Sequence, residues 1–378
     1  YRPRPSPPTM DGTVRGDGVH LGGDARQRFH DSRGYGRPLD GNDVLVSFVE
    51  AAHLLFRGDL DAVDGDGFEA FFAAATRRHE RFALRFLVYA DLRERGFYLS
   101  PARESWPGPT GPASTPEGVA PGVVDFVVYP RGKGPRDGAV AHRVRVVDAL
   151  ERLPVGELPG VALAVVDEES EITYFDASTT EPSGTASYDP PEGVRGVLLG
   201  DRVVCWDAPP ALYERGFFGQ PLSGRDAVVS DALQLSLVEA AALVARGALV
   251  LDVPGGDDGA DGGVGRDGAS EGPGYDEVVE RGRHVEGERF DRRLRTYTEL
   301  REAGLVPKTG FKFGADFRTY AAFDGVDDLG HSESLVRVVT PEHVFAPRDL
   351  SLDVRLAGGV RKRLTYAVTD ATGVDWVA

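Results

Sequence analysis

Residues 46–60 read V-S-F-V-E-A-A-H-L-L-F-R-G-D-L, and residues 235–249 read L-S-L-V-E-A-A-A-L-V-A-R-G-A-L, identical at nine of fifteen positions. In each copy a serine precedes an apolar run at helical spacing, and a glutamate follows three residues after that serine, which is the pattern of a capping box. A glycine, Gly58 or Gly247, then ends the helix. A helix repeated with the same start and stop signals predicts a chain built twice from one unit.

The repeat extends on both sides of this helix. Upstream, R-G-Y-G-R-P-L at 33–39 matches R-G-F-F-G-Q-P-L at 215–222. Downstream, a second amphipathic helix that ends in glycine is predicted at 85–96 and again at 293–304. Three strand patterns follow it in each copy: 123–129, 144–147 and 161–167 in the first, and 314–320, 336–339 and 364–370 in the second.

These patterns predict an α/β (α+β) chain of two tandem repeats, each with an α/β lead domain followed by a domain of one helix and a mixed sheet. Two low-complexity insertions, at 101–122 and 253–274, distinguish the copies and are predicted to be solvated loops. The predicted segments are a disordered leader at 1–9, a lead domain at 10–83, a helix-plus-sheet domain at 84–178, a second lead domain at 185–285 and a second helix-plus-sheet domain at 286–378.

Charge and composition limit the function classes. The net charge is −17, yet residues 290–378 hold 13 basic and 13 acidic side chains, so the whole negative excess lies in residues 1–289. Abundant Asp and Glu with only four lysines against 39 arginines is typical of a halophilic organism, so the acidity does not exclude a nucleic-acid partner. No apolar run approaches 18 residues and no secretion signal is present, which predicts a cytoplasmic protein without a membrane span.

The two copies differ in a few polar residues. Tyr320 of the second copy has a counterpart in Tyr129 of the first. His331 falls opposite Ala139, and Lys362 falls opposite Pro159. Only the second copy therefore carries a tyrosine, a histidine and a lysine together, which predicts one active copy and one scaffold copy.

A family resemblance lies in the same region. The stretch Y-T-E-L-R-E-A-G-L-V-P-K-T-G-F-K-F-G-A-D-F-R-T-Y (297–320), then H-S-E-S-L-V (331–336), then V-R-K-R-L-T-Y-A-V-T-D (360–370), closely resembles the archaeal tRNA-splicing endonucleases in their long form, which has two fused repeats per chain. The similarity covers nearly all of residues 10–378. It implies a homodimer that cuts intron-containing precursor tRNA at bulge–helix–bulge splice sites without a metal or other cofactor. The domain at 84–178 would then be a degenerate nuclease domain, and the domain at 286–378 the catalytic one.

By this resemblance, Tyr320, His331 and Lys362 form the catalytic triad. In the family's usual assignment Tyr320 is the base for the 2′-hydroxyl, His331 is the acid for the departing 5′-oxygen, and Lys362 stabilises the charge on the pentacoordinate phosphate. The products would be a 2′,3′-cyclic phosphate and a 5′-hydroxyl. A base, an acid and a fixed cation suit this chemistry without a metal.

Two other interpretations stay open on the sequence. In a metal-dependent nuclease Asp316 would be a ligand, although Asp125 occupies the same position in the copy that lacks the histidine and the lysine. Alternatively, the chain is a non-catalytic RNA-binding structural subunit in which the three groups are incidental.

The resemblance implies two further sites. Members of the family dock an acidic loop of one repeat into a basic pocket of another, and the best match is D-E-E-S-E at 167–171, which supplies Asp167, Glu168, Glu169 and Glu171. The family also holds a flipped bulge base between two arginines, a cation–π contact. Arg355 is the candidate for one of them, in what is predicted to be a polar loop before Lys362. The second arginine has no assigned position in this sequence.

Overall fold

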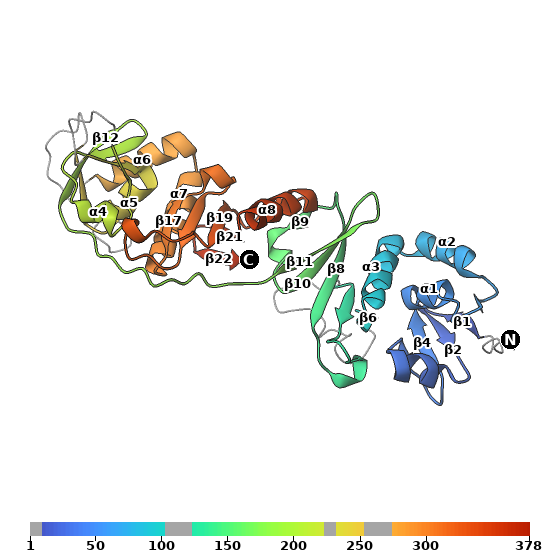
Figure 1. Cartoon of the computed structure of the whole chain (residues 1–378). Helices are drawn as coiled ribbons and strands as arrows, with labels where there is room; N and C mark the ends of the chain where they lie inside the picture. Colours follow the sequence, from blue (N-terminus) through green and yellow to red (C-terminus); the bar gives the residue numbers. More distant parts are fainter. Residues whose placement is uncertain (1–9, 103–122, 223–231, 253–273) are drawn as a thin grey trace. The chain divides into compact units, whose positions relative to one another are not determined.

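The computed structural model describes residues 10–102, 123–222, 232–252 and 274–378. The chain divides into two compact units (Figure 1). Unit 1 comprises Tyr1–Ser178 with Val344–Asp349, and unit 2 comprises Thr179–His343 with Leu350–Ala378. The predicted leader at 1–9 and nearly all of the two predicted insertions lie outside the described residues. The bounds of the four predicted domains stay predictions.

Each unit begins with a five-stranded sheet. The strands are β1 (Asp11–Arg15), β2 (Gly18–Leu21), β3 (Arg37–Pro38), β4 (Val44–Ser47) and β5 (Ala62–Val63) in unit 1, and β12 (Val194–Leu199), β13 (Arg202–Cys205), β14 (Gln220–Pro221), β15 (Leu233–Ser236) and β16 (Leu249–Asp252) in unit 2. The orders are β3-β4-β2-β1-β5 and β14-β15-β13-β12-β16, so the two sheets have the same topology. In both, the last pair is parallel and the other pairs are antiparallel.

The helices also correspond between the units. Unit 1 contains the π-helix η1 (Arg26–Asp31), α1 (Phe48–Phe56), α2 (Phe68–Arg78) and α3 (Phe82–Glu94). Unit 2 contains α4 (Pro210–Glu214), α5 (Leu237–Ala245), α6 (Tyr275–Glu286) and α7 (Arg289–Glu302), and α8 (Pro347–Gly359) begins in the segment assigned to unit 1. No helix in the described ranges is long and apolar enough to cross a membrane.

A second five-stranded sheet follows in each unit. Its strands are β6 (Leu99–Pro101), β7 (Phe126–Val128), β8 (His142–Asp148), β10 (Val161–Val166) and β11 (Ile172–Ala177) in unit 1, and β17 (Val306–Thr309), β18 (Phe317–Tyr320), β19 (Ser334–Val339), β21 (Arg363–Thr369) and β22 (Val374–Val377) in unit 2. The orders β6-β7-β8-β10-β11 and β17-β18-β19-β21-β22 are again the same, with one parallel pair in each sheet. Unit 1 also holds the short pair β9 (Leu153–Pro154) and β20 (Val344–Phe345).

The register of these sheets confirms the alignment of the two copies. Val144 pairs with Ala162 in the first copy, and Val336 pairs with Thr365 in the second. In the sequence alignment Val144 is equivalent to Val336, and Ala162 is equivalent to Thr365. The same alignment places His331 opposite Ala139 and Lys362 opposite Pro159. The two copies therefore align in the structure as they do in the sequence.

The predicted capping boxes are confirmed in both copies. Ser47 accepts the Glu50 N–H and Glu50 accepts the Ser47 N–H, and Ser236 and Glu239 do the same. Gly58 follows the end of α1 at φ +70°, a left-handed conformation that favours glycine. Both cap glutamates are buried, which ties the start of each helix to the preceding strand.

The predicted second helix begins earlier than its repeat pattern, as α3 and α7, and its tyrosine holds the two parts of the unit together. In unit 1 the fully buried Tyr89 of α3 lies 5.3 Å from the His53 ring of α1 and 5.7 Å from the Phe126 ring of β7, measured between centroids. Tyr297 of α7 lies 5.9 Å from Phe317 of β18. One hydrophobic cluster in each unit includes residues of both sheets.

The predicted strands at 123–129 and 314–320 are shorter in the structure, because an aspartate side chain enters the ladder where each strand begins. Asp125 Oδ2 accepts the Val146 N–H at 2.8 Å, and Asp316 Oδ2 accepts the Val338 N–H at 2.9 Å. Regular pairing starts one residue later, at Phe126 in the first copy.

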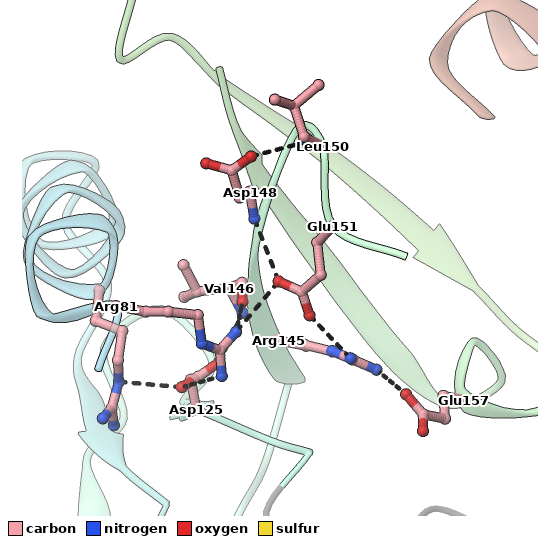
Figure 2. Close-up of polar contacts among 9 residues, drawn as sticks. Arg81, Asp125, Arg145, Val146, Asp148, Leu150, Glu151 and Glu157 are labelled. Carbon is pink, nitrogen blue, oxygen red and sulfur yellow. Dashed lines mark hydrogen bonds and ion pairs between the residues drawn. The ribbon is translucent and has the colours of Figure 1, made fainter. Parts of the chain in front are cut away.

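Arginines at or near the start of the preceding helix form ion pairs with these buried aspartates. In the first copy, Asp125 contacts Arg85 at 3.0 Å and Arg81 at 3.8 Å. Figure 2 shows Arg81 between Asp125 and Glu151, and it also shows Arg145 between Glu151 and Glu157. A buried carboxylate held by two arginines and a backbone N–H is satisfied by its structural partners.

Candidate active site

Tyr320 is the last residue of β18 and its side chain is 5% exposed. It pairs with Val306 of β17, and its ring centroid lies 5.8 Å from that of Phe217. The Arg318 guanidinium lies 5.9 Å from the Tyr320 ring centroid. Tyr320 is therefore a rigidly packed side chain whose position depends on both the sheet and the lead part of unit 2.

Lys362 follows the end of α8 and is placed there by a Schellman motif. The Lys362 N–H donates to the Ala357 carbonyl at 2.9 Å, and the Arg361 N–H donates to the Gly358 carbonyl at 3.0 Å. Arg361 takes the left-handed conformation at φ +55°, a position where glycine is usual. A non-glycine residue in this region costs about 1–2 kcal/mol. The chain carries this local strain immediately before the lysine.

Helix α8 is tied to the second sheet of unit 2 by a partly buried polar contact. Arg337 of β19 forms an ion pair with Asp353, and the Tyr366 hydroxyl of β21 donates to the same carboxylate at 3.1 Å. In the first copy the equivalent Arg145 instead contacts Glu151 and Glu157 (Figure 2). The contact to Asp353 anchors the helix that leads to Lys362.

His331 lies in the exposed segment before β19, and its neighbours connect it to the other two residues. The Lys362 ammonium donates to the carbonyl of Ser332. The Glu333 N–H donates to the Thr319 carbonyl at 3.0 Å, and the Arg363 N–H donates to the Glu333 carbonyl at 2.9 Å. The sequence neighbours of all three predicted catalytic residues are therefore joined by direct hydrogen bonds.

The topology explains this convergence. Strand β18 runs antiparallel to β19 and ends at Tyr320, while the parallel strands β19 and β21 both begin at that edge. A cleft of about 310 Å³ opens beside it, lined in part by Ala321, Glu333 and Arg363. The structure brings Tyr320, His331 and Lys362 to one edge of one sheet.

The first copy has a different arrangement at the same edge. Tyr129 is fully buried, and its hydroxyl donates to Ser100 Oγ at 3.0 Å. Burial raises the pKa of Tyr129 to about 12, although the bond to Ser100 opposes this shift. A fully buried tyrosine whose hydroxyl already has a hydrogen-bond partner fits a structural role in the core.

A buried ion pair joins α5 to β17, the strand that pairs with β18, and the sequence patterns did not predict it. Lys308 Nζ lies 2.7 Å from Glu239 Oε1, and both side chains are 10% exposed. Burial alone would raise the pKa of Glu239, but the Lys308 ammonium and the N–H groups of Ser236 and Gly219 together outweigh burial and lower that pKa to about 2. Two sequence signals could have pointed to it: the scarcity of lysine, and the place of Lys308 opposite Ser100 in the aligned copies.

Arg355 does not lie in the predicted polar loop. It is an exposed residue within α8, because the segment before Lys362 continues as helix to Gly359. The apolar residues of this segment include the buried Leu350 and Ala357, seven positions apart, which is a helical spacing. The predicted role of Arg355 stays a prediction.

The acidic loop at 167–171 is the exposed turn between β10 and β11 in unit 1. Asp167 Oδ1 accepts the N–H groups of Glu169 and Glu171, both at 2.9 Å, so this carboxylate shapes the turn itself. Glu168, Glu169 and Glu171 extend from a turn whose backbone is fixed. Their predicted docking role stays a prediction.

Asp316 is engaged by structural partners, as Asp125 is. It contacts Arg289 at 2.6 Å and Arg293 at 3.2 Å, in addition to the Val338 N–H. Within the described ranges, no group of three or more His, Cys, Asp or Glu side chains could hold a metal ion. These contacts favour the structural interpretation of Asp316 over the metal-ligand one.

Comparisons with known proteins agree with this architecture. The family model of the tRNA intron endonuclease catalytic C-terminal domain matches residues 290–376. The model of the tRNA intron endonuclease N-terminal domain matches twice, at residues 10–72 and 194–259, one match in each copy. The catalytic match contains Tyr320, His331 and Lys362.

Similar proteins cover almost the whole chain. The tRNA-splicing endonuclease of Halobacterium salinarum is 59% identical over 372 residues, which is 98% of each chain. That of Haloferax volcanii is 54% identical over 370 residues, again 98% of each chain. That of Methanosarcina mazei is 36% identical over 382 residues, 96% of each chain. The predicted resemblance is confirmed, and the chain belongs to the tRNA intron endonuclease family.

Proposed function

We propose that this chain cuts intron-containing precursor tRNA at bulge–helix–bulge splice sites, with Tyr320 as base, His331 as acid and Lys362 as the cation that stabilises the phosphate. Membership of the family makes it an endonuclease of tRNA splicing. The observation that supports the finer proposal is the convergence of these three residues at one sheet edge in the second copy. The products are a 2′,3′-cyclic phosphate and a 5′-hydroxyl, since the 2′-hydroxyl is the nucleophile.

One experiment tests this proposal directly. Purified protein is incubated with a bulge–helix–bulge RNA in excess chelator, and the ends of the fragments are analysed. Cleavage in the bulges with cyclic phosphate ends supports the proposal. Cleavage that stops in chelator, or fragments with 5′-phosphate ends, would favour a metal-dependent nuclease.

The enzyme is further proposed to act in the cytoplasm as a homodimer, in which two catalytic copies match the two splice junctions of one intron. The acidic loop provides the docking contact. Charges that stay exposed are screened beyond about 8 Å at physiological salt and more strongly in a halophile, so the loop must be partly buried when it docks.

Neutralising the acidic loop is expected to weaken the dimer by about tenfold or more, because several charge contacts are lost together. The variant carries Asp167→Asn with Glu168→Gln, Glu169→Gln and Glu171→Gln. Asparagine keeps an oxygen that can accept the turn hydrogen bonds of Asp167. Light scattering over a dilution series measures the dimer, and activity should fall only at dilute protein. A dimer unchanged at every concentration contradicts the docking role.

Arg355 is proposed to stack on an unpaired base of the bulge. Such stacking contributes about 1–3 kcal/mol per base. We expect Arg355→Ala to weaken binding of a bulged RNA by the corresponding five- to 150-fold, approximately. Arg355→Lys should lose about as much, because lysine keeps the charge without the plane. Affinities are measured against the bulged RNA and a fully paired control. A lysine variant that binds like the wild type assigns Arg355 a charge role only.

A further inference from the structure

The two copies differ in the residue that neighbours the tyrosine of the sheet edge. Ser100 pairs with Val127 in the first copy, and Lys308 pairs with Arg318 in the second. In the first copy the Tyr129 hydroxyl donates to Ser100. In the second the corresponding side chain ends in an ammonium group, which has no lone pair to accept such a bond.

The Lys308 ammonium is fully engaged elsewhere. It donates to Glu239 Oε1 at 2.7 Å, to the Phe217 carbonyl at 3.1 Å and to the Gly219 carbonyl at 3.0 Å. Three donors meet three acceptors, so the side chain is held in one place. Among the described residues, no hydrogen bond involves the Tyr320 hydroxyl.

Phe217 is a second difference at this place. Its N–H donates to the carbonyl four residues earlier, as the N–H of Gly34 does in the first copy. Both residues adopt the left-handed conformation, Phe217 at φ +50° and Gly34 at φ +69°. Phenylalanine is strained in this conformation, and such strain often marks a functional position. The Phe217 ring lies 5.8 Å from the Tyr320 ring and 4.9 Å from Lys308 Nζ.

We propose that Lys308 is a positioning residue of the catalytic copy, one that removes the hydrogen-bond acceptor found in the first copy and so leaves the Tyr320 hydroxyl free for the RNA. Phe217, held through its carbonyl by Lys308, packs against the tyrosine ring and keeps it oriented. The inference rests on the proposed role of Tyr320 in cleavage.

The first copy shows that the fold tolerates the loss of this lysine. Glu50 occupies the place of Glu239 and accepts the Gly36 and Ser47 N–H groups, but within the described part of the chain it has no lysine partner. Burial raises the pKa of Glu50, and its backbone hydrogen bonds only oppose that shift. A variant without Lys308 can therefore take up the arrangement of the first copy, with a carboxyl group that protonates more readily.

The test compares Lys308→Ser with Lys308→Ala. Both lose the ion pair and leave a similar volume, but only serine offers an acceptor to the Tyr320 hydroxyl. Single-turnover cleavage at saturating enzyme is expected to be about three- to tenfold slower for serine than for alanine, the usual effect of one hydrogen bond. Affinity for the RNA should be the same in the two variants, and the serine variant should melt at the same or a slightly higher temperature, because its added hydrogen bond also stabilises the fold. Ser100→Ala in the first copy serves as the control and should cleave at the wild-type rate.

Equal single-turnover rates for the serine and alanine variants would overturn the inference. If both variants unfold, Lys308→Gln and Lys308→Met repeat the comparison at nearly the original volume. Glutamine offers an acceptor oxygen and methionine does not offer a comparable one, so the glutamine variant should be the slower of the two. Tyr320→Phe separates this inference from the proposed function. If Tyr320→Phe cleaves normally, the proposed catalytic role of Tyr320 is wrong. If Tyr320→Phe is slow but Lys308→Ser and Lys308→Ala cleave at equal rates, only the proposed role of Lys308 is wrong.

Discussion

Replacing His331 with alanine is expected to slow cleavage of a bulged precursor tRNA by about 10²–10⁴-fold, the usual contribution of a positioned general acid. RNA binding and folding should not change, because His331 lies in an exposed segment rather than in the core. The measurement is the single-turnover rate at saturating enzyme, together with affinity for the RNA and the melting temperature.

The matched control for this variant is His284→Ala. His284 is also exposed, but it lies on α6, away from the sheet edge that carries Tyr320. The control should cleave at the wild-type rate. A normal rate for His331→Ala would contradict the acid role and leave the departing 5′-oxygen to another group.

Replacing Lys362 with alanine is expected to lower the single-turnover rate by about 10²–10³-fold, because a fixed positive group aimed at the developing charge is lost. The Schellman motif that places residue 362 uses backbone groups only, so it should survive the substitution. Lys362→Arg keeps the charge and should recover part of the rate.

Lys133 in the first copy provides the control. Its ammonium contacts Asp137 at 3.6 Å on the surface of unit 1, and Lys133→Ala should leave cleavage unchanged. If Lys362→Ala weakens RNA binding but cleaves normally once saturated, Lys362 contacts a phosphate in the ground state and does not stabilise the transition state.

Much of the fold was predictable because its signals are local. The capping boxes at Ser47 and Ser236 depend on residues three positions apart, and helix and strand periods are visible within a short window. Duplication strengthened these signals, since each pattern occurs twice with the same spacing. The strand ends were less predictable, because Asp125 and Asp316 insert side chains into ladders formed with distant strands.

The helix around Arg355 shows a second limit. Arg355 was predicted to lie in a polar loop, yet it lies in α8, where Asp353 is anchored by Arg337 and Tyr366 of the sheet. Tertiary contacts of this kind override weak local preference. The anchoring partners lie at least 13 positions away in the chain.

The sequence by itself determined the two-copy architecture, two helices and three strands of each copy in their order, and the identity of Tyr320, His331 and Lys362 as the set that only one copy carries. These conclusions follow from residue types and spacings that are present in the unfolded chain. Tertiary structure alone decided that the three meet at one edge, because strand direction and register set that edge. It also decided the pairing of Lys308 with Glu239, which are 69 positions apart. A charged side chain needs a partner of opposite charge only where folding removes it from water.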